Sequence, residues 1–164
     1  MRIYTGYAGD FALLNYYQHC GLQPVIISGG RINGYPHCKD SKYCKSLAPM
    51  LKWWYPWHKS LNEYNLTTAQ KWYKKYYTNN ILHRLDPETT YKELSKLGDD
   101  KQIILCCAGE REEYLFCHRH IIAKWLENNI TDLKVVEFPH PSQHLLLSFA
   151  NLFQKPLLSV SITL

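Results

Sequence analysis

The sequence predicts an α/β fold in which a mainly parallel sheet is flanked by helices in a single three-layer domain. Short apolar runs alternate with helical patterns over the first 138 residues, and this order is typical of parallel β-α-β units. A strand, a helix and a second strand are already recognisable within residues 2–28. At 164 residues the chain has the size of one domain with its own hydrophobic core.

The first 28 residues predict one β-α-β unit. Residues 2–5 favour a strand, and the Gly-Tyr-Ala-Gly stretch at 6–9 interrupts it before a helix at 10–20. Gly21 is placed to end that helix, because glycine readily adopts the left-handed conformation found after helix ends. Residues 24–28 form a short β-branched run, which predicts a buried strand parallel to the first.

Residues 29–65 interrupt this alternation with an aromatic-rich insertion. The segment has no clear periodicity, and insertions of this length are often functional. Its aromatic cluster at 53–57 either packs as a satellite core or offers a platform on which bases stack. His37, Cys38 and Cys44 lack a paired C-x-x-C spacing, so we expect ordinary loop thiols there and no metal site.

Two helices are predicted next. Residues 67–70 match a capping box, and aromatic residues then recur at helical spacing to about Arg84. Lysines on the opposite face would suit nucleic acid, but an amphipathic helix needs a solvated charged face in any case. Asp86 and Pro87 are placed as the N-cap and first residue of the following helix, which Gly98 ends. The lysines concerned are Lys71, Lys74 and Lys75.

The remainder of the chain predicts three strands and two helices. An apolar strand at 103–107 leads through a charged loop to a helix that begins near Cys117. Residues 134–138 have the character of a strand, and a helix is expected at 142–153. Apolar and polar residues alternate from 158 to 164, which predicts a terminal strand with one face buried away from water.

The composition favours a soluble protein with an anionic partner. Lys and Arg exceed Asp and Glu by 19 to 14, which gives a net charge of +5 with histidine neutral. We expect a cytoplasmic location and no membrane partner, because no segment approaches the roughly 20 apolar residues of a bilayer span and no signal peptide is recognisable. The six cysteines are then expected to be reduced. No dinucleotide fingerprint or P-loop is present, so no cofactor is expected.

The segment richest in potentially reactive side chains joins the strand at 103–107 to the helix at Cys117. A thiol in the first turn of a helix has its pKa lowered by the helix dipole and by neighbouring cations. Cys117 is therefore a candidate catalytic nucleophile, with His118 as the proton carrier. Alternatively Cys117 only packs, since it shares a helix face with Ile121 and Trp125, and burial would make it inert.

Neighbouring residues extend this candidate site. Arg119 is placed either to grip phosphate or carboxylate through two hydrogen bonds, or to pair with an acidic residue at 110–113. His120 adds a positive charge when it is protonated. Cys106 and Cys107 alternate faces of their strand, so one of them points toward the helix. They are either redox partners of the helix thiol or buried reduced cysteines.

This segment also resembles the signature of the family called domain of unknown function 488. The resemblance covers residues 1–138 and implies a compact three-layer α/β fold. It implies site positions at Cys106, Cys117, His118 and Arg119, and it brings no settled reaction. The residues that carry it are the Phe-Cys-His-Arg-His-Ile-Ile-Ala-Lys-Trp-Leu run at 116–126, Ile-Leu-Cys at 104–106, and shorter stretches at 3–7, 46–49 and 85–87.

Two features depart from the pattern of that family. The loop between the strand thiols and Cys117 is longer than the family pattern, which changes the expected pocket. Residues 139–164 are a C-terminal addition that either covers a sheet edge or forms a dimer contact, so a homo-oligomer remains open.

Together these features predict the binding of a nucleotide-like or phosphorylated small ligand at the carboxyl ends of the parallel strands. Sequestration of a nucleotide messenger, for example in conflict between a virus and its host, is one form of this function. The alternatives are a cysteine-dependent enzyme acting on a nucleotide or nucleoside, and a nucleic-acid-binding protein. The expected ligand-binding residues are Gly6, Tyr7, Gly9, Gly29, Gly30, Arg31, Trp53, Trp54, Cys106, Arg119 and His120.

Overall fold

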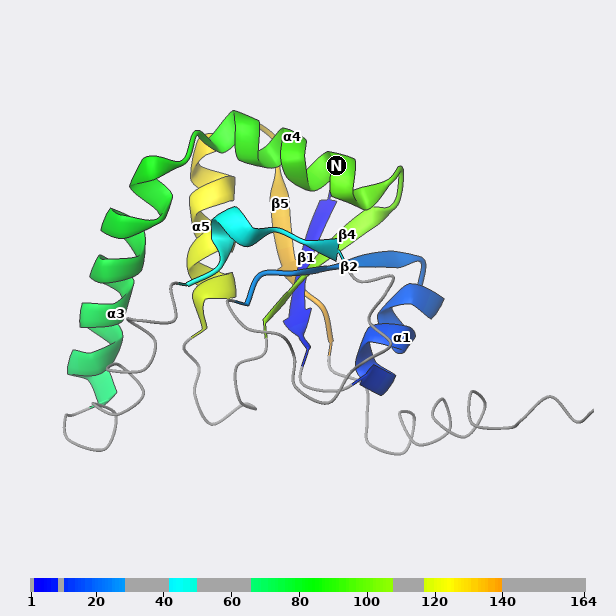
Figure 1. The fold of residues 1–164 in the computed structure, drawn as a ribbon, viewed down its shortest axis with the longest axis horizontal. Coiled ribbons are helices and arrows are strands. Elements are labelled where there is room, and N and C mark those ends of the chain that lie inside the picture. The colour runs from blue at the N-terminus through cyan, green and yellow to red at the C-terminus, as the bar shows by residue number, and fades with distance from the viewer. Residues whose placement is uncertain (1, 9–10, 29–41, 50–65, 108–116, 140–164) are drawn as a thin grey trace, which may run out of the picture.

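The computed structural model describes residues 2–8, 11–28, 42–49, 66–107 and 117–139. Within them, five strands form one sheet in the order β3-β2-β4-β1-β5, and every neighbouring pair is parallel (Figure 1). This architecture confirms the predicted α/β fold. The strands are β1 (Arg2–Tyr7), β2 (Leu22–Ile26), β3 (Lys42–Tyr43), β4 (Gln102–Cys107) and β5 (Lys134–Glu137).

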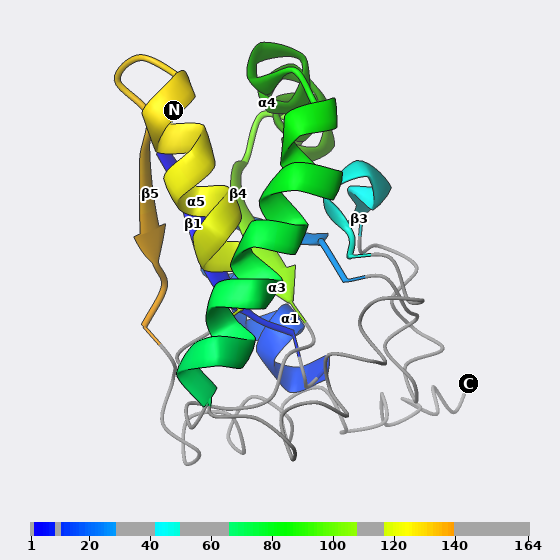
Figure 2. The same ribbon diagram turned by 90° about the vertical axis from the view of Figure 1, so that its left-hand side faces the viewer.

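Helices cover both faces of this sheet, so the fold has the three layers that the sequence predicts. One hydrophobic core lies between the sheet and α1, and a larger core lies between the sheet and the other three α-helices. Figure 2 shows α3, α4 and α5 on one side of the strands and α1 behind them. The helices are α1 (Phe11–His19), α3 (Leu66–Asn80), α4 (Pro87–Gly98) and α5 (His118–Asn129), with 3-10 turns η2 (Lys45–Leu47) and η3 (Leu82–Arg84).

Strand β4 runs through the middle of the sheet and divides its side chains between the two cores. Ile103, Leu105 and Cys107 belong to the larger core beneath α3, α4 and α5, whereas Ile104 and Cys106 belong to the core beneath α1. Because side chains alternate along a strand, neighbouring thiols face opposite ways. Because of this alternation, Cys107 lies beneath α5 and Cys106 does not.

Strand β1 extends past Thr5, where the sequence predicted its end, to Tyr7. Gly6 pairs with Cys106 within the sheet, so it continues the strand instead of interrupting it. A Cβ atom at this position would lie 2.7 Å from Ile104 Cδ1 and 2.9 Å from Tyr17 Oη. Gly6 therefore provides the space in which Tyr17 packs against the sheet.

The helix ends follow the predicted capping chemistry in most places. Gly21 follows α1 with a φ of +78°, and the Asp86 carboxylate accepts a hydrogen bond of 2.8 Å from the Thr89 backbone N–H at the start of α4. Helix α4 ends at Gly98, but the left-handed residue is Asp99, with a φ of 52°. Helix α3 begins at Leu66, one residue before the predicted capping box, and ends at Asn80 before the separate turn η3.

Some predicted elements fall in the part of the chain that the structure does not describe. The helix expected at 142–153, the strand at 158–164 and most of the insertion at 29–65 lie outside the described residues. Within that insertion the structure adds β3, a strand of two residues that is too short to leave a periodic pattern. Among the helices that the structure describes, none has the length and apolar character needed to cross a bilayer.

Candidate functional site

Cys117 lies where the carboxyl edge of the sheet meets the start of a helix. Strand β4 ends at Cys107, and α5 begins at His118, so Cys117 is the N-cap residue. Its backbone is extended, with a φ of −132° and a ψ of 145°, and its side chain makes no capping hydrogen bond. The sulfur therefore lies beside the positive end of the helix dipole without being engaged by the backbone N–H groups there.

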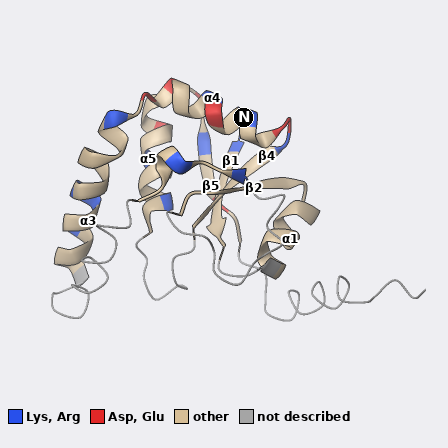
Figure 3. Cartoon of the chain, in the orientation of Figure 1, with Lys and Arg blue, Asp and Glu red and all other residues tan. Residues whose placement is uncertain are grey.

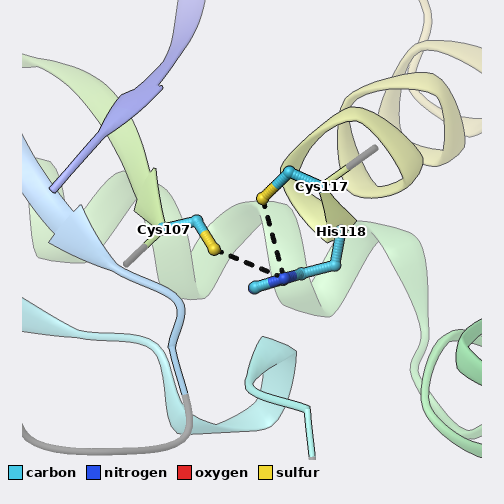
Figure 4. A group of neighbouring side chains, drawn as sticks. All are labelled: Cys107, Cys117 and His118. Carbon is cyan, nitrogen blue, oxygen red and sulfur yellow. Dashed lines mark hydrogen bonds between the residues drawn. The ribbon is translucent and has the colours of Figure 1, made fainter. Parts of the chain in front are cut away.

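Two thiols and one imidazole meet at this point. The Nδ1 atom of His118 lies 3.4 Å from the Cys107 sulfur and 3.9 Å from the Cys117 sulfur. Figure 4 shows both sulfur atoms facing this one ring nitrogen, Cys107 from the end of β4 and Cys117 from the start of α5. All three residues are buried, and Cys117 is the most exposed of them, at 8%. The site is thus a compact Cys-His-Cys cluster.

The orientation of the His118 ring is fixed from its other side. Its Nε2 atom lies 2.9 Å from the backbone carbonyl oxygen of Ile27, just after β2. A carbonyl oxygen only accepts hydrogen bonds, so Nε2 carries a hydrogen, and Nδ1 is the nitrogen that faces the two sulfur atoms. The Tyr77 ring of α3 packs against the imidazole with a centroid separation of 5.5 Å.

This environment favours the thiolate form of Cys117. The hydrogen bond from the Cys107 thiol lowers the pKa of Cys117 most strongly, and the nearby His118 and Arg119 lower it further. Burial acts in the opposite direction, yet the pKa of Cys117 stays well below that of a free thiol. A thiolate is the reactive form of cysteine, both as a nucleophile and as a metal ligand.

A charged cluster lies next to the thiols and is centred on Glu137, the last residue of β5. One carboxylate oxygen of Glu137 accepts hydrogen bonds from Arg119 Nε at 3.1 Å and Nη2 at 3.0 Å. The other oxygen accepts from the Thr5 hydroxyl and lies 3.2 Å from His120 Nε2. Arg119 therefore pairs with an acidic residue that sequence spacing did not indicate, and the acidic residues at 110–113 lie outside the described part of the chain.

The Glu137 carboxylate should make the stability of the fold depend on pH. Partial burial raises its pKa, but hydrogen bonds from His120, Thr5 and Arg119 lower it from 4.5 to about 2. Because the pKa is lower in the folded state, Glu137 stabilises the fold fully above about pH 4.5, and this contribution is lost as the pH falls toward about 2.

We expect Glu137→Gln to lower the free energy of unfolding by about 1–2 kcal/mol near neutral pH, after allowing for solvent screening of a half-exposed side chain. At about pH 3 the difference from the unchanged protein should fall to less than half, because most of the linked stabilisation is then lost. Urea unfolding at the two pH values measures this. Glu88→Gln, an exposed residue of α4, is the matched control. A difference of equal size at both pH values would contradict the prediction.

The structure brings some of the predicted ligand-binding residues together and separates others. Arg119 and His120 contact Glu137 in the charged cluster, which lies beside the Cys-His-Cys cluster. Gly6 and Tyr7 lie at the end of the neighbouring β1. Cys106 faces the core beneath α1, where burial raises the pKa of its thiol, so it does not join Cys117. The predicted residues outside the described part of the chain are Gly9, Gly29, Gly30, Arg31, Trp53 and Trp54.

Cys107 is one of the site residues that the sequence prediction left out. The sequence indicated that one of the two strand thiols faces the helix, but it did not show which one. The signal was the alternation of side chains along the strand. Cys107 is two and four positions after Leu105 and Ile103, so it points to the same face as these residues, which line the core beneath α5. Knowing which face of β4 the helix α5 covers would have identified it.

The basic face predicted for α3 lies apart from the thiol cluster. Lys71, Lys74 and Lys75 are exposed, and Figure 3 shows this basic character along the helix. On the same helix the Trp72 ring is stacked on Tyr76, with ring centroids 5.5 Å apart and Trp72 44% exposed. The opposite side of α3 is buried through Tyr73 and Tyr77, as expected of an amphipathic helix.

Comparisons with family models, curated proteins and solved structures found no match to this chain. The resemblance to the domain of unknown function 488 therefore stays a prediction.

Proposed function

We propose that this chain is a cysteine-dependent enzyme that acts on a nucleotide-like or otherwise phosphorylated small molecule. In this proposal Cys117 is the nucleophile and His118 is the proton carrier. The observation that supports it best is that the His118 ring lies between the Cys117 sulfur, 3.9 Å from its Nδ1 atom, and the Ile27 carbonyl oxygen, 2.9 Å from its Nε2 atom. Nucleophile, base and a third group that orients the base form the recurring arrangement of nucleophilic catalysis.

The distances suit a resting state of such an enzyme. The 3.9 Å between the Cys117 sulfur and His118 Nδ1 is long for proton transfer, but catalytic hydrogen bonds are often loose without substrate. The Ile27 carbonyl stabilises a protonated ring as well as a neutral one, because Nε2 donates in both states. The pair therefore can exist as a thiolate and an imidazolium.

The chemistry follows from this ion pair. The thiolate sulfur forms a bond to an electrophilic carbon or phosphorus atom of the substrate, and the bond to the leaving group breaks. The leaving group takes the proton from His118 Nδ1. Water then attacks the covalent intermediate, His118 accepts the proton of that water, and the Cys117 sulfur leaves as a thiolate. Atoms and protons balance over the two steps, and no oxidant or reductant is needed.

The preference for a phosphorylated substrate rests on the surroundings of Cys117. Ligands of parallel α/β sheets generally bind at the carboxyl ends of the strands, and β4 ends at this site. The start of α5 directs backbone N–H groups there, and Arg119 contributes a guanidinium held in place by Glu137. The Glu137 carboxylate partly offsets this positive charge, so a substrate with few negative charges fits better than a polyphosphate.

The proposal is tested by incubating the purified protein with a mixed nucleotide and metabolite extract, washing it, and identifying the retained molecules by mass spectrometry. A processed product, or a substrate-derived adduct mapped to Cys117, is the expected result. Cys20→Ser removes an exposed thiol at the end of α1 and should give the same result. Recovery of an unchanged nucleotide would instead indicate sequestration without turnover, and recovery of nothing from a folded sample would count against a small-molecule site.

Nucleic-acid binding is a second candidate, favoured by the exposed Trp72 stacked on Tyr76 among lysines. Aromatic faces and basic side chains together bind single strands. If α3 binds nucleic acid, the affinity falls steeply as salt is added, and that slope decreases when the three lysines are replaced.

A further inference from the structure

The nucleophilic mechanism uses Cys117 and His118 but assigns no chemical step to Cys107. Cys107 is nevertheless the thiol closer to His118 Nδ1, at 3.4 Å. We propose that Cys107, Cys117 and His118 form a binding site for a thiophilic divalent metal ion of the zinc type. This inference goes beyond the proposed function, and it rests on geometry that holds whether or not the chain is an enzyme.

The spacing of the three atoms fits tetrahedral coordination. In a tetrahedral zinc site a thiolate sulfur and an imidazole nitrogen lie about 3.6 Å apart, and two sulfurs lie about 3.8 Å apart. The two sulfur-to-nitrogen distances here, 3.4 Å and 3.9 Å, lie on either side of that value. All three ligand atoms lie within 4.8 Å of one another. Small side-chain adjustments would therefore place them around one ion.

The hydrogen bond on the far side of the His118 ring supports the same inference. Histidines that bind a metal almost always donate their other ring N–H to a carbonyl or carboxylate, which fixes the tautomer. The Nε2–H group of His118 has this partner in the Ile27 carbonyl, at 2.9 Å. The lone pair of Nδ1 is thereby directed toward the two thiols.

The ligand types identify the class of metal. Two thiolates and one imidazole form a soft ligand set that favours zinc over magnesium or calcium, which prefer oxygen ligands. The set has three members among the residues that the structure describes. A zinc site with three protein ligands leaves a fourth position for water or another small ligand, as in catalytic sites, whereas structural sites are closed by four.

Metal binding and nucleophilic catalysis use the same sulfur and exclude each other. A bound ion occupies the electron pair with which Cys117 would attack a substrate. Zinc should consequently protect Cys117 from alkylation, and it should inhibit any turnover that depends on the free thiolate. The site would then make the activity of the chain sensitive to zinc.

Cobalt(II) is the probe for this site, because cobalt bound by thiolates gives a charge-transfer absorption that oxygen ligands do not give. The reduced full-length chain is treated with a chelator, dialysed and titrated with cobalt, and zinc is then added in competition. We expect a thiolate-to-cobalt band that saturates at one ion per chain and disappears when zinc displaces the cobalt. Absence of the band in a folded sample would overturn the inference.

Variants locate the site. Cys107→Ser and His118→Ala should each lower the affinity for cobalt by more than about 100-fold, because even outer partners of metal ligands are worth 10- to 100-fold. Cys106→Ala is the matched control, since its thiol is one residue away on the opposite face of β4, and it should bind as the unchanged protein does. If His118→Ala does not fold, Cys107→Ser alone decides the question. Unchanged affinity in Cys107→Ser would contradict the proposed ligand set.

The cobalt titration and the extract experiment separate the two proposals. Cobalt binding without any product or adduct would support the metal site and count against the enzyme. Turnover in a chain that gives no cobalt band would support the enzyme and count against the metal site. Turnover that requires zinc would confirm metal binding but would replace Cys117 as the nucleophile.

Discussion

Replacing Cys117 with alanine should abolish turnover, lowering kcat by at least about 10³-fold, while the affinity for the ligand changes only a few-fold. The sulfur would be the atom that forms the covalent bond, and nothing else among the described residues at the start of α5 offers a comparable nucleophile. Binding depends instead on Arg119 and the helix N-terminus, which the substitution leaves in place. The measurements are the steady-state rate and the ligand Kd with the substrate identified from the extract.

Cys106→Ala is the control for this prediction, because it removes a neighbouring thiol from the other side of the sheet. It should keep most of the activity. If Cys117→Ala retained turnover and Cys106→Ala lost it, the assignment of the nucleophile would be wrong. If neither variant lost turnover, the thiols would have no covalent role.

The rate of alkylation at each pH tests the thiolate directly. In the metal-free chain, iodoacetamide should modify Cys117 with a midpoint well below the value of about 8.5 for a free thiol. His118→Gln should move the midpoint upward, because the ring that helps to lower the pKa of Cys117 is lost. A midpoint for Cys117 at or above the free-thiol value would contradict the proposed ion pair.

Most of the fold could be predicted because its elements have local signals. The β-branched run at 24–28, the Asp-Pro pair that starts α4 and the apolar run at 103–107 each reflect propensity or capping within a few residues. The parallel order followed from the β-α-β alternation. The missed strand β3 has only two residues and is defined by its pairing with β2, which leaves no local pattern.

The site could be predicted only in part because its contacts are made across the fold. Cys117 and His118 are adjacent in the sequence and lie at a predicted helix start, and this local pattern was enough to identify both as candidate site residues. The partner of Arg119 is Glu137, 18 positions later, and the partner of His118 is the carbonyl of Ile27, 91 positions earlier. A backbone carbonyl has no signature in a sequence. The choice of Cys107 over Cys106 required knowledge of which sheet face α5 covers.

Tyr77→Ala should have the largest effect on stability, lowering the free energy of unfolding by about 3–5 kcal/mol. Tyr77 is fully buried in α3, and its hydroxyl donates a hydrogen bond to the Leu47 carbonyl oxygen of η2. Its ring stacks on Tyr73 at 6.0 Å and packs against His118. Removing the ring therefore leaves a cavity between two helices and frees one side of the imidazole. Urea unfolding measures the loss.

Tyr77→Phe separates the ring from its hydroxyl. It should cost about 1–3 kcal/mol, because the Leu47 carbonyl is left buried without this partner, while the packing against His118 remains. Trp72→Ala on the exposed face of the same helix is the control and should cost less than about 1 kcal/mol. If the Tyr77 ring positions His118, Tyr77→Phe should keep the low alkylation midpoint of Cys117 and Tyr77→Ala should raise it. Equal midpoints in two folded variants would show that the Ile27 carbonyl alone is sufficient to hold the imidazole.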